Sequence, residues 1–335
     1  RATVYASTQM VSGSVGEFAQ LLELPADRVR VVCEYMGGGF GAKFGAGLEG
    51  RVACLVVRAL KRPVHLLLDR PQEFALTGNR SGTRALVRAG ASREGGLVGL
   101  SMSVDRHGGM GQGSFPTPPY IYRAGASHSR VRAVHTAMEA SVAMRAPGHP
   151  QASFAMESTM DELAYALGVD PLEFRKQNLA DAVWHRQLDR VAAELGWGEH
   201  PNRTQPGRED PHGLAEGIGF GITTWHAGGA PGAEAELRIH SDGSVVSSCA
   251  VQDLGTGART YVAAVPAEVL GLPLEAVQAR IGDSDLPPGV GSGGSVTTGS
   301  VVPALQKAAH AARRALEERI APIPPCGWPS RTPAP

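Results

Sequence analysis

Three short segments combine glycine, hydroxyl and arginine side chains in ways that suit ligand binding. The first, Gly37–Lys43 (GGGFGAK), surrounds one phenylalanine with glycines, so backbone N–H groups can approach a ligand with no side chain between. The second, Met144–Gly148 (MRAPG), places Arg145 in a turn, ready to present its guanidinium to an anion or an oxygen. The third, Ser292–Gly299 (SGGSVTTG), offers hydroxyls and backbone donors beside a helix start, which suits a phosphate or another anion. Each also has a purely structural interpretation: a tight turn, a surface arginine and a flexible linker.

Nucleotide-binding motifs explain the first segment poorly. Gly37–Lys43 is not a P-loop, because Phe44 follows the lysine where Ser or Thr is needed. Its glycine spacing satisfies only the loosest dinucleotide fingerprint, which also needs an acidic residue about twenty positions later. Asp69 comes too late for that role. A dinucleotide-binding oxidoreductase, which requires one parallel sheet, therefore remains an alternative interpretation.

Metal-ligating patterns are missing from the sequence. The four cysteines do not form a CxxC pair, which excludes a zinc ribbon and an iron–sulfur cluster held by closely spaced ligands. The histidines show no HExxH spacing, and we interpret the cysteines as small buried hydrophobes. Asp161 and Glu162 point to different sides of a predicted helix, and we interpret them as electrostatic support for its early turns.

Composition limits the possible functions. The 335 residues include 32 basic and 32 acidic side chains, and this zero net charge argues against binding nucleic acid or an anionic membrane. The apolar runs stop at charges, so no transmembrane helix and no membrane insertion is expected. The first residues have no signal-peptide shape, although a lost export signal stays possible. We expect a soluble bacterial protein of the cytoplasm or periplasm.

Hydrophobic periodicity and turn residues predict a mixed set of elements. The chain contains β-rich runs, amphipathic stretches and Gly-rich turns in alternation. Strands are expected at Val29–Tyr35, Val64–Leu68 and Val277–Ile281, and hairpins at Arg84–Asp105 and Ala235–Val251. Helices are expected at Ser14–Leu24, Leu48–Leu60, Phe154–Leu167, Pro171–Asn178, Trp184–Gly196, Thr260–Leu270 and Val302–Ile320.

An internal repeat organises these elements. The run Leu22–Val29 (LELPADRV) is echoed by Leu270–Val277 (LGLPLEAV), and each copy follows a helix and leads into a strand and a glycine-rich loop. A small polar turn precedes each copy, Ser7–Gln9 in one and Gly255–Gly257 in the other. We interpret the repeat as a duplication, which predicts an α+β fold of two related mixed units joined by a helical segment. The expected boundaries are residues 1–150, 151–212 for the helices and linker, 213–321 for an incomplete second unit, and 322–335 for an irregular Pro-rich tail.

Taken in order, the motifs resemble one family. They are Thr8-Gln9, GGGFGAK, MRAPG, Glu157 with DELA at Asp161–Ala164, LGVDPLEFRKQN at Leu167–Asn178, DLGTG at Asp253–Gly257 and the stretch Gly282–Thr298. This series resembles the molybdopterin-binding large subunit of the xanthine dehydrogenase / aldehyde oxidase family, most of all the bacterial aldehyde oxidoreductases. The resemblance covers residues 5–320 and implies that both glycine loops serve one molybdenum–pterin cofactor.

The resemblance also implies roles for individual residues. Gln9, Phe40 and Arg145 match positions around the molybdenum, with Gly294 near it, and the metal itself is held by pterin sulfurs rather than by protein. The residues implied in cofactor binding are Gln9, Gly39, Phe40, Gly41, Arg145, Gly255, Thr256, Gly257, Gly294, Ser295 and Thr297. Phe44 and Pro147 are implied in the substrate pocket. Purine-oxidising relatives carry a glutamate where Phe44 stands, so an aldehyde or another neutral substrate is favoured.

The family chemistry is oxidative hydroxylation with oxygen from water, and it implies cofactors and partners. A cytosine dinucleotide form of the molybdopterin is expected, with FAD and 2Fe-2S centres on separate partner subunits, because no flavin fingerprint or cysteine cluster is present. The general-base glutamate of the family belongs to a motif past the end of this sequence, so no catalytic residue is assigned. We therefore expect this chain, a fragment by that comparison, to be inactive alone. A non-catalytic remnant of the same fold is the alternative.

Overall fold

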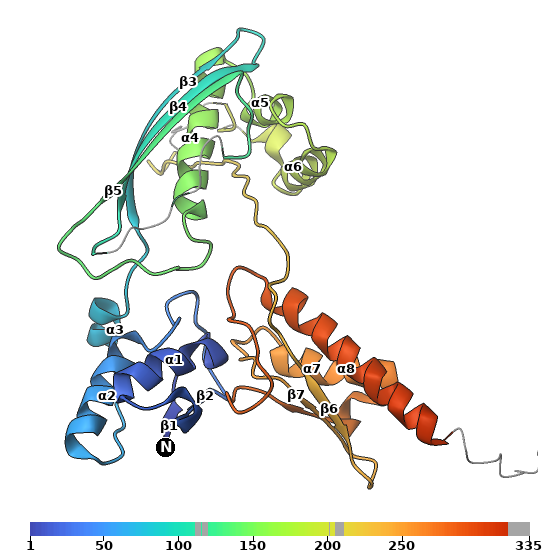
Figure 1. Cartoon of the computed structure of the whole chain (residues 1–335). Coiled ribbons are helices and arrows are strands. Elements are labelled where there is room, and N and C mark those ends of the chain that lie inside the picture. Colours follow the sequence, from blue (N-terminus) through green and yellow to red (C-terminus); the bar gives the residue numbers. More distant parts are fainter. Residues whose placement is uncertain (111–114, 116–119, 201, 205–210, 321–335) are drawn as a thin grey trace, which may run out of the picture. The chain divides into compact units, whose positions relative to one another are not determined.

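The computed structural model of the chain describes residues 1–335 except 111–114, 116–119, 201, 205–210 and 321–335. The chain divides into two compact units: the first combines Arg1–Thr77 with His226–Pro335, and the second is Gly78–Trp225. Each unit has its own sheets and its own buried core (Figure 1). The predicted tail 322–335 lies outside the described residues, as do residues 201 and 205–210 of the predicted helical segment and linker 151–212.

The first unit contains the predicted duplication. In one copy, β1 and β2 form a parallel pair joined by α1, and α2 follows. In the other, β7 and β8 form a parallel pair joined by α7, and α8 follows. The first copy and its C-terminal helix are β1 (Ala2–Tyr5), α1 (Val11–Leu22), β2 (Val29–Val32), α2 (Gly47–Leu60) and α3 (Arg70–Leu76). The second copy is β6 (Glu236–Ile239), β7 (Val245–Ser248), α7 (Ala258–Leu270), β8 (Val277–Arg280) and α8 (Thr297–Ile320).

The repeat extends to the helix ends, which confirms that it is structural. Glu23 (φ 54°) and Gly271 (φ 69°) each end their helix in the left-handed conformation. In each copy the next residue donates its N–H to a carbonyl of the last helical turn, from Leu24 to Ala19 and from Leu272 to Ala267. This cap turns the chain toward the Leu-Pro step and the second strand in both copies.

Hydrogen bonds and an ion pair join the two copies into one unit. Arg30 of β2 donates through Nε to Asp283 at 2.9 Å, and the backbone N–H of Cys33 donates to the Gly282 carbonyl at 2.7 Å. The guanidinium holds the pKa of the Asp283 carboxyl below its usual range. The loop after β8 therefore lies beside β2, and the glycine loops that follow β2 and β8 belong to the same unit.

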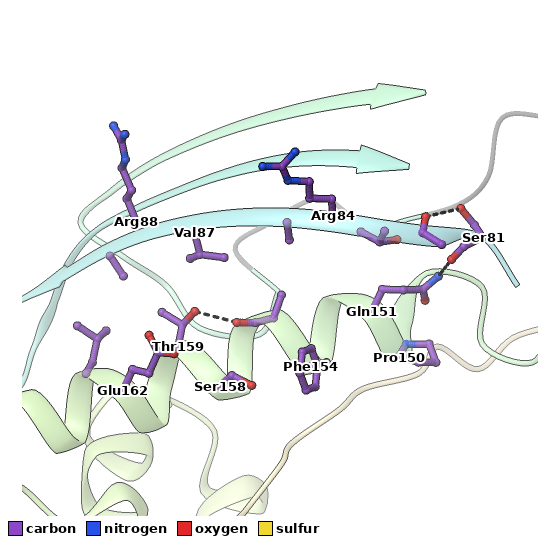
Figure 2. Close-up of a pocket in the computed structure, with 16 residues that line it drawn as sticks. Ser81, Arg84, Val87, Arg88, Pro150, Gln151, Phe154, Ser158, Thr159 and Glu162 are labelled. Atoms are coloured by element: carbon purple, nitrogen blue, oxygen red, sulfur yellow. Dashed lines mark hydrogen bonds between the residues drawn. The ribbon is translucent and has the colours of Figure 1, made fainter. Parts of the chain in front are cut away.

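The second unit is a three-stranded sheet covered by helices (Figure 1). Its strands pair in the order β3-β4-β5, with β3 antiparallel to β4 and β4 parallel to β5. Helix α4 lies along the sheet beside β3 (Figure 2), and its buried residues recur every fourth position, at Ala152, Met156, Met160 and Ala164. The elements are β3 (Gly82–Ala91), β4 (Leu97–His107), β5 (Ala126–Val134), α4 (His149–Leu167), α5 (Pro171–Gln177) and α6 (Ala182–Glu194).

The antiparallel pairs β3–β4 and β6–β7 exclude the single parallel sheet of a dinucleotide-binding domain. The α+β class and the related mixed units are confirmed. Two predicted features are wrong. Val64–Leu68 forms no strand, because in the described part of the chain no other strand pairs with it, and Leu67 is exposed. Helix α8 begins at Thr297 rather than at Val302, inside the segment predicted to be a glycine-rich loop.

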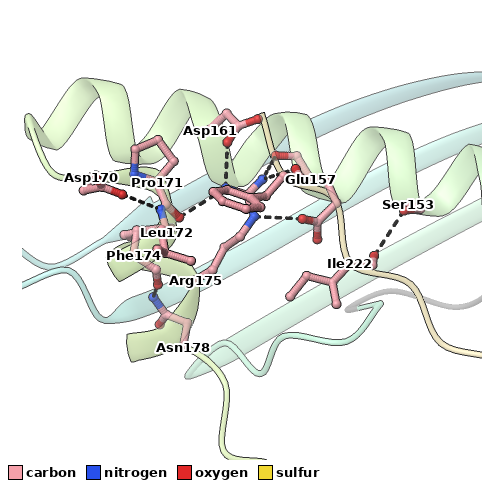
Figure 3. A network of polar contacts seen from close by, with 11 residues as sticks. Ser153, Glu157, Asp161, Asp170, Pro171, Leu172, Phe174, Arg175, Asn178 and Ile222 are labelled. Carbon is pink, nitrogen blue, oxygen red and sulfur yellow. Dashed lines mark hydrogen bonds and ion pairs between the residues drawn. The ribbon is translucent and has the colours of Figure 1, made fainter. Parts of the chain in front are cut away.

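A buried ionic network fixes α4 against α5 in the second unit (Figure 3). The fully buried Arg175 donates to Glu157 Oε2 at 2.9 Å, to Asp161 Oδ1 at 2.6 Å and to the Phe220 carbonyl at 3.0 Å. Burial alone would lower the pKa of Arg175, but the two carboxylates raise it, so the guanidinium stays charged. The interpretation of Asp161 as support for early helix turns is wrong, since α4 begins at His149 and Asp161 pairs with Arg175.

Candidate functional site

Gln9 links the two glycine loops of the first unit. Its side chain is 2% exposed, and Oε1 accepts the backbone N–H groups of Gly41 at 2.9 Å and Lys43 at 3.2 Å. Nε2 donates to the Ser292 carbonyl at 2.6 Å, and the Gln9 carbonyl accepts the Ser292 N–H at 2.8 Å. One buried amide therefore holds Gly37–Lys43 and Ser292–Gly299 side by side, which fits the implication of the family resemblance that both loops serve one cofactor.

Gln252 has the corresponding place in the second copy, and the sequence analysis missed it. Fully buried after β7, it accepts the Val11 N–H at 3.0 Å through Oε1 and donates to the Val290 carbonyl at 3.1 Å. Gln9 follows β1 as Gln252 follows β7, and both precede the helix of their copy. Aligning the two copies from their first strands would have identified this residue.

The first glycine loop has a conformation that requires its small residues. Phe40 adopts a left-handed φ of 52° and its side chain is 59% exposed. A Cβ at Gly39 would lie 2.5 Å from the Gln9 side chain, so that glycine permits the close approach of Gln9. A Cβ at Gly293 would lie 2.5 Å from the Phe44 ring, which therefore packs against the second loop. The sequence placed Phe44 in the substrate pocket, and the structure shows it in contact with the second glycine loop.

The DLGTG segment is organised around its own aspartate. Asp253 Oδ1 accepts the N–H groups of Gly255 at 2.9 Å, Thr256 at 3.0 Å and Gly257 at 3.2 Å, and Oδ2 accepts that of Arg259 at 3.0 Å. Burial alone would raise the pKa of Asp253, but these four donors lower it below its usual range. The carboxylate thus occupies the anion position at the start of α7, and the N–H groups of this loop serve the protein's own cap.

A pocket of about 430 Å³ lies in the first unit where this loop faces the first glycine loop. Gly37 and Gly255 line it, and a Cβ added to either would meet no atom within 4 Å. Arg259 forms one wall, with its guanidinium 4.9 Å from the Tyr35 ring centroid and an Nη2 hydrogen bond of 2.8 Å to the Glu34 carbonyl. The pocket is therefore a cradle of backbone with one fixed cation at its side.

The second glycine loop presents a different helix start. Gly294 (φ 61°) and Ser295 (φ 59°) are both exposed in left-handed conformations, and Thr297 is the first residue of α8. No acidic residue lies in the first turn of α8, in contrast to the Asp253 cap of α7. The leading N–H groups of a helix have no partner inside it, so this start suits an external anion such as a phosphate.

Arg145 and Pro147 belong to the second unit, in the turn that precedes α4. Arg145 is exposed, and its carbonyl accepts a hydrogen bond of 2.8 Å from Arg80. Ala146 has a φ of 57°, and the turn closes with a 3.0 Å bond from the His149 N–H to the Ala146 carbonyl. The structure brings together Gln9, Gly39, Phe40, Gly41, Gly255, Thr256, Gly257, Gly294, Ser295 and Thr297 in one unit, with Arg145 and Pro147 in the other.

Side chains of the described residues provide no group of three or more His, Cys, Asp or Glu that could hold a metal ion. Cys33, Cys54 and Cys249 are free and buried, and burial raises the pKa of each thiol. Among the described helices, none is both long and apolar enough to cross a membrane.

Family models match almost the whole chain. Two models described as molybdopterin cofactor-binding domains match residues 1–179 and 190–326. The chain belongs to the molybdopterin-binding xanthine dehydrogenase / aldehyde oxidase family. The resemblance drawn from the motifs is confirmed. The first copy of the duplication lies within the range of the first model, and the second copy lies within that of the second.

Curated members of this family share about a third of the aligned residues. The molybdenum-binding subunit PaoC of the aldehyde oxidoreductase of Escherichia coli K12 is 32% identical over 311 residues, covering 87% of this chain and 42% of the relative. The putative xanthine dehydrogenase molybdenum-binding subunit XdhA of the same organism is 28% identical, covering 92% of this chain and 44% of the relative. The chain thus spans less than half the length of these relatives.

Solved structures show the same fold at lower identity. The aldehyde oxidoreductase of Desulfovibrio gigas aligns with a TM-score of 0.72 at 22% identity, covering 92% of this chain and 36% of that one. A Cu,Mo-containing CO dehydrogenase aligns with a TM-score of 0.72 at 19% identity, covering 95% of this chain and 46% of that one. These alignments support the molybdopterin-binding fold of the family member described here.

Proposed function

We propose that this chain is the cofactor-holding part of a molybdenum-dependent oxidoreductase that oxidises aldehydes or related neutral substrates. The main supporting observation is the Gln9 amide, which joins both glycine loops in one unit. When bound, the molybdenum–pterin cofactor supplies the two-electron oxidation of a carbon–hydrogen bond with oxygen from water. The residues present fit such a group, because the cradle at Gly37 and Gly255 is open where a Cβ would otherwise project.

Each loop has a separate task in this proposal. Gly37, Gly255 and Gly257 leave room for the flat pterin, and Thr256 provides a hydroxyl beside it, since Asp253 already occupies the backbone donors. Ser295 and Thr297 offer hydroxyls and helix-start N–H groups to the phosphate. Gln9, Gly39, Phe40, Gly41 and Gly294 form the wall near the metal in the first unit. Arg259 is an additional cation for an anionic cofactor.

The substrate preference rests on Phe44. Its ring packs on Gly293 and is 38% exposed, so it offers an apolar edge and no carboxylate that could pair with a purine. We therefore propose a neutral aldehyde-like substrate. The further proposals are a cytosine dinucleotide form of the cofactor, partner subunits that carry FAD and 2Fe-2S centres, and a bacterial cytoplasmic or periplasmic location.

The substrate proposal is tested on the complex purified from the native host, with an artificial electron acceptor. An aromatic aldehyde is expected to be oxidised at least about tenfold faster than xanthine. The variant Phe44→Glu is expected to narrow that ratio, because a carboxylate edge can pair with a purine. Faster oxidation of xanthine by the unaltered complex would contradict the assignment. The iron, flavin and pterin contents of the same complex test the proposal that partner subunits carry FAD and 2Fe-2S centres.

A further inference from the structure

Strand β3 forms one edge of the sheet in the second unit. In the described part of that sheet β3 pairs with β4 alone, so its other edge has no strand neighbour. Its residues Arg84, Ala85 and Leu86 are all exposed. An edge of this kind carries a row of backbone donors and acceptors that another extended segment can pair with.

A groove runs along this edge, between β3 and α4 (Figure 2). Its volume is about 1130 Å³. Val87 points from the strand toward the helix, and Ser158 and Glu162 line the groove from α4 (Figure 2). A segment added beside β3 would therefore place every second side chain over α4. Small or neutral side chains fit there, because the exposed Glu162 carboxylate would repel an acidic one.

The groove contains polar atoms that have no hydrogen-bond partner among the residues that the structure describes. Gln151 donates through Nε2 to the Ser81 carbonyl at 2.8 Å, but its Oε1 atom is buried with no hydrogen bond. Thr83 Oγ1, on the adjoining end of β3, is also buried and has no hydrogen bond among the described residues. Because a buried polar atom without a hydrogen bond is unfavourable, both atoms indicate that a polar group from outside fits here.

The other side of the strand carries positive charge. Arg84 and Arg88 rise from β3 on the side away from α4 (Figure 2). Leu86, the residue midway between them along the strand, is exposed as well. Both arginines line the groove, and both are exposed. On a neighbouring strand the facing positions would favour acidic, apolar and acidic side chains at every second residue, because cross-strand pairs of opposite charge are stabilising.

We propose that β3 is a docking edge for an extended acidic segment of a partner polypeptide. The segment adds a strand beside β3, its backbone N–H groups face Gln151, and two acidic side chains four residues apart pair with Arg84 and Arg88. A second copy of this chain fits less well. A two-fold pairing of β3 with itself centred on Leu86 would place Arg84 opposite Arg88, and like charges in facing positions repel.

The test uses the full chain and a short fluorescein-labelled peptide with the facing pattern Glu-x-Val-x-Glu, read by fluorescence anisotropy. The double variant Arg84→Glu/Arg88→Glu is expected to bind it at least about tenfold more weakly, because two attractive pairs become repulsive. The same double variant is expected to gain binding of the matched peptide Lys-x-Val-x-Lys. Since both side chains are exposed, the substitutions leave the core intact.

The control is Arg130→Glu, an exposed arginine of β5 at the opposite edge of the same sheet. It is expected to leave the affinity for the acidic peptide within about twofold. The proposal is overturned if the acidic peptide does not bind the unaltered chain, or if charge reversal on β3 and on β5 weakens binding equally. In that case the two arginines protect the edge from pairing rather than receive a partner.

Discussion

At the scale of single residues, Gln9 links the two glycine loops of the first unit through buried hydrogen bonds. Replacing it in Gln9→Ala leaves the Gly41 and Lys43 N–H groups and the Ser292 carbonyl without their partner in a buried place. Because each unmet buried group costs about 1–3 kcal/mol, we expect the free energy of unfolding to fall by about 2–4 kcal/mol in denaturant titrations. Gln20→Ala, at an exposed position of α1, should change it by less than about 0.5 kcal/mol. Equal effects of the two variants would contradict the linking role of Gln9.

Arg175 has a comparable place in the second unit. The variant Arg175→Met leaves Glu157 as a buried carboxylate without its counter-ion and should lower the free energy of unfolding by about 3–5 kcal/mol. The double variant Arg175→Met/Glu157→Leu removes both charges, and thermal unfolding should show it to be more stable than the single variant. The control Arg190→Ala breaks an exposed pair with Glu194 on α6 and should have little effect. A double variant no more stable than the single one would refute the unpaired-charge explanation.

The sequence analysis found a site residue only where a recognisable motif contained it. The glycine loops were found because their composition is distinctive in the linear sequence, and Gln9 was found through the family resemblance. Gln252 and Arg259 were missed, because their partners Val11 and Glu34 are more than two hundred residues away and no local pattern marks the contact. Asp161 was misinterpreted for a different reason: its partner Arg175 is close in sequence but lies on another helix, and only the packing of α4 against α5 brings the two together.

At the scale of elements, the start of α7 depends on one carboxylate. Four N–H groups hold the pKa of Asp253 below its usual range. A carboxyl group whose pKa is lower in the folded chain than in the unfolded chain stabilises the fold at pH values above the unfolded pKa of about 3.9. This stabilisation is lost as the pH falls through the lower pKa of the folded chain. Asp253→Asn should therefore reduce the free energy of unfolding by about 1 kcal/mol at neutral pH. The difference should shrink below about pH 4.

Denaturant titrations of the two proteins at several pH values measure that difference. The matched control is Asp27→Asn, an exposed carboxylate outside the loop, which should stay within about 0.5 kcal/mol of the unaltered chain. A difference for Asp253→Asn that grows toward acid pH would show that the carboxylate does not cap α7 in the way described.

Element predictions succeeded where local signals agree with the tertiary structure. Turn residues and apolar spacing located the hairpins and most helices, and the Leu-Pro repeat located the duplication. Val64–Leu68 has strand-forming residues, but a strand needs a hydrogen-bonding neighbour, which sequence alone does not reveal. The start of α8 was placed too late because glycine and threonine are weak helix formers, and its N-terminal turn packs Val301 and Ser300 into the unit regardless.

At the scale of the whole molecule, two family models and a shared fold describe nearly the whole chain, although the chain spans less than half the length of its curated relatives. In the first unit, we propose that the two glycine loops and the DLGTG segment together form the binding site for the molybdenum–pterin cofactor. Gly37 offers the sharpest probe of that place, because a larger side chain there would project into open space without straining the backbone.

The most direct measurement is the pterin and molybdenum content of the chain purified from a host that makes the cofactor. Pterin is read by fluorescence after oxidation and molybdenum by mass spectrometry, for the unaltered chain, Gly37→Val and Gly16→Val. Gly16 also faces open space, but on α1, so its variant controls for the substitution itself. The account predicts that the unaltered chain and Gly16→Val retain pterin and that Gly37→Val loses more than about half of it, with unchanged circular dichroism, because the valine fills the cradle. A folded, unaltered chain without pterin, or equal retention by Gly37→Val, would contradict it.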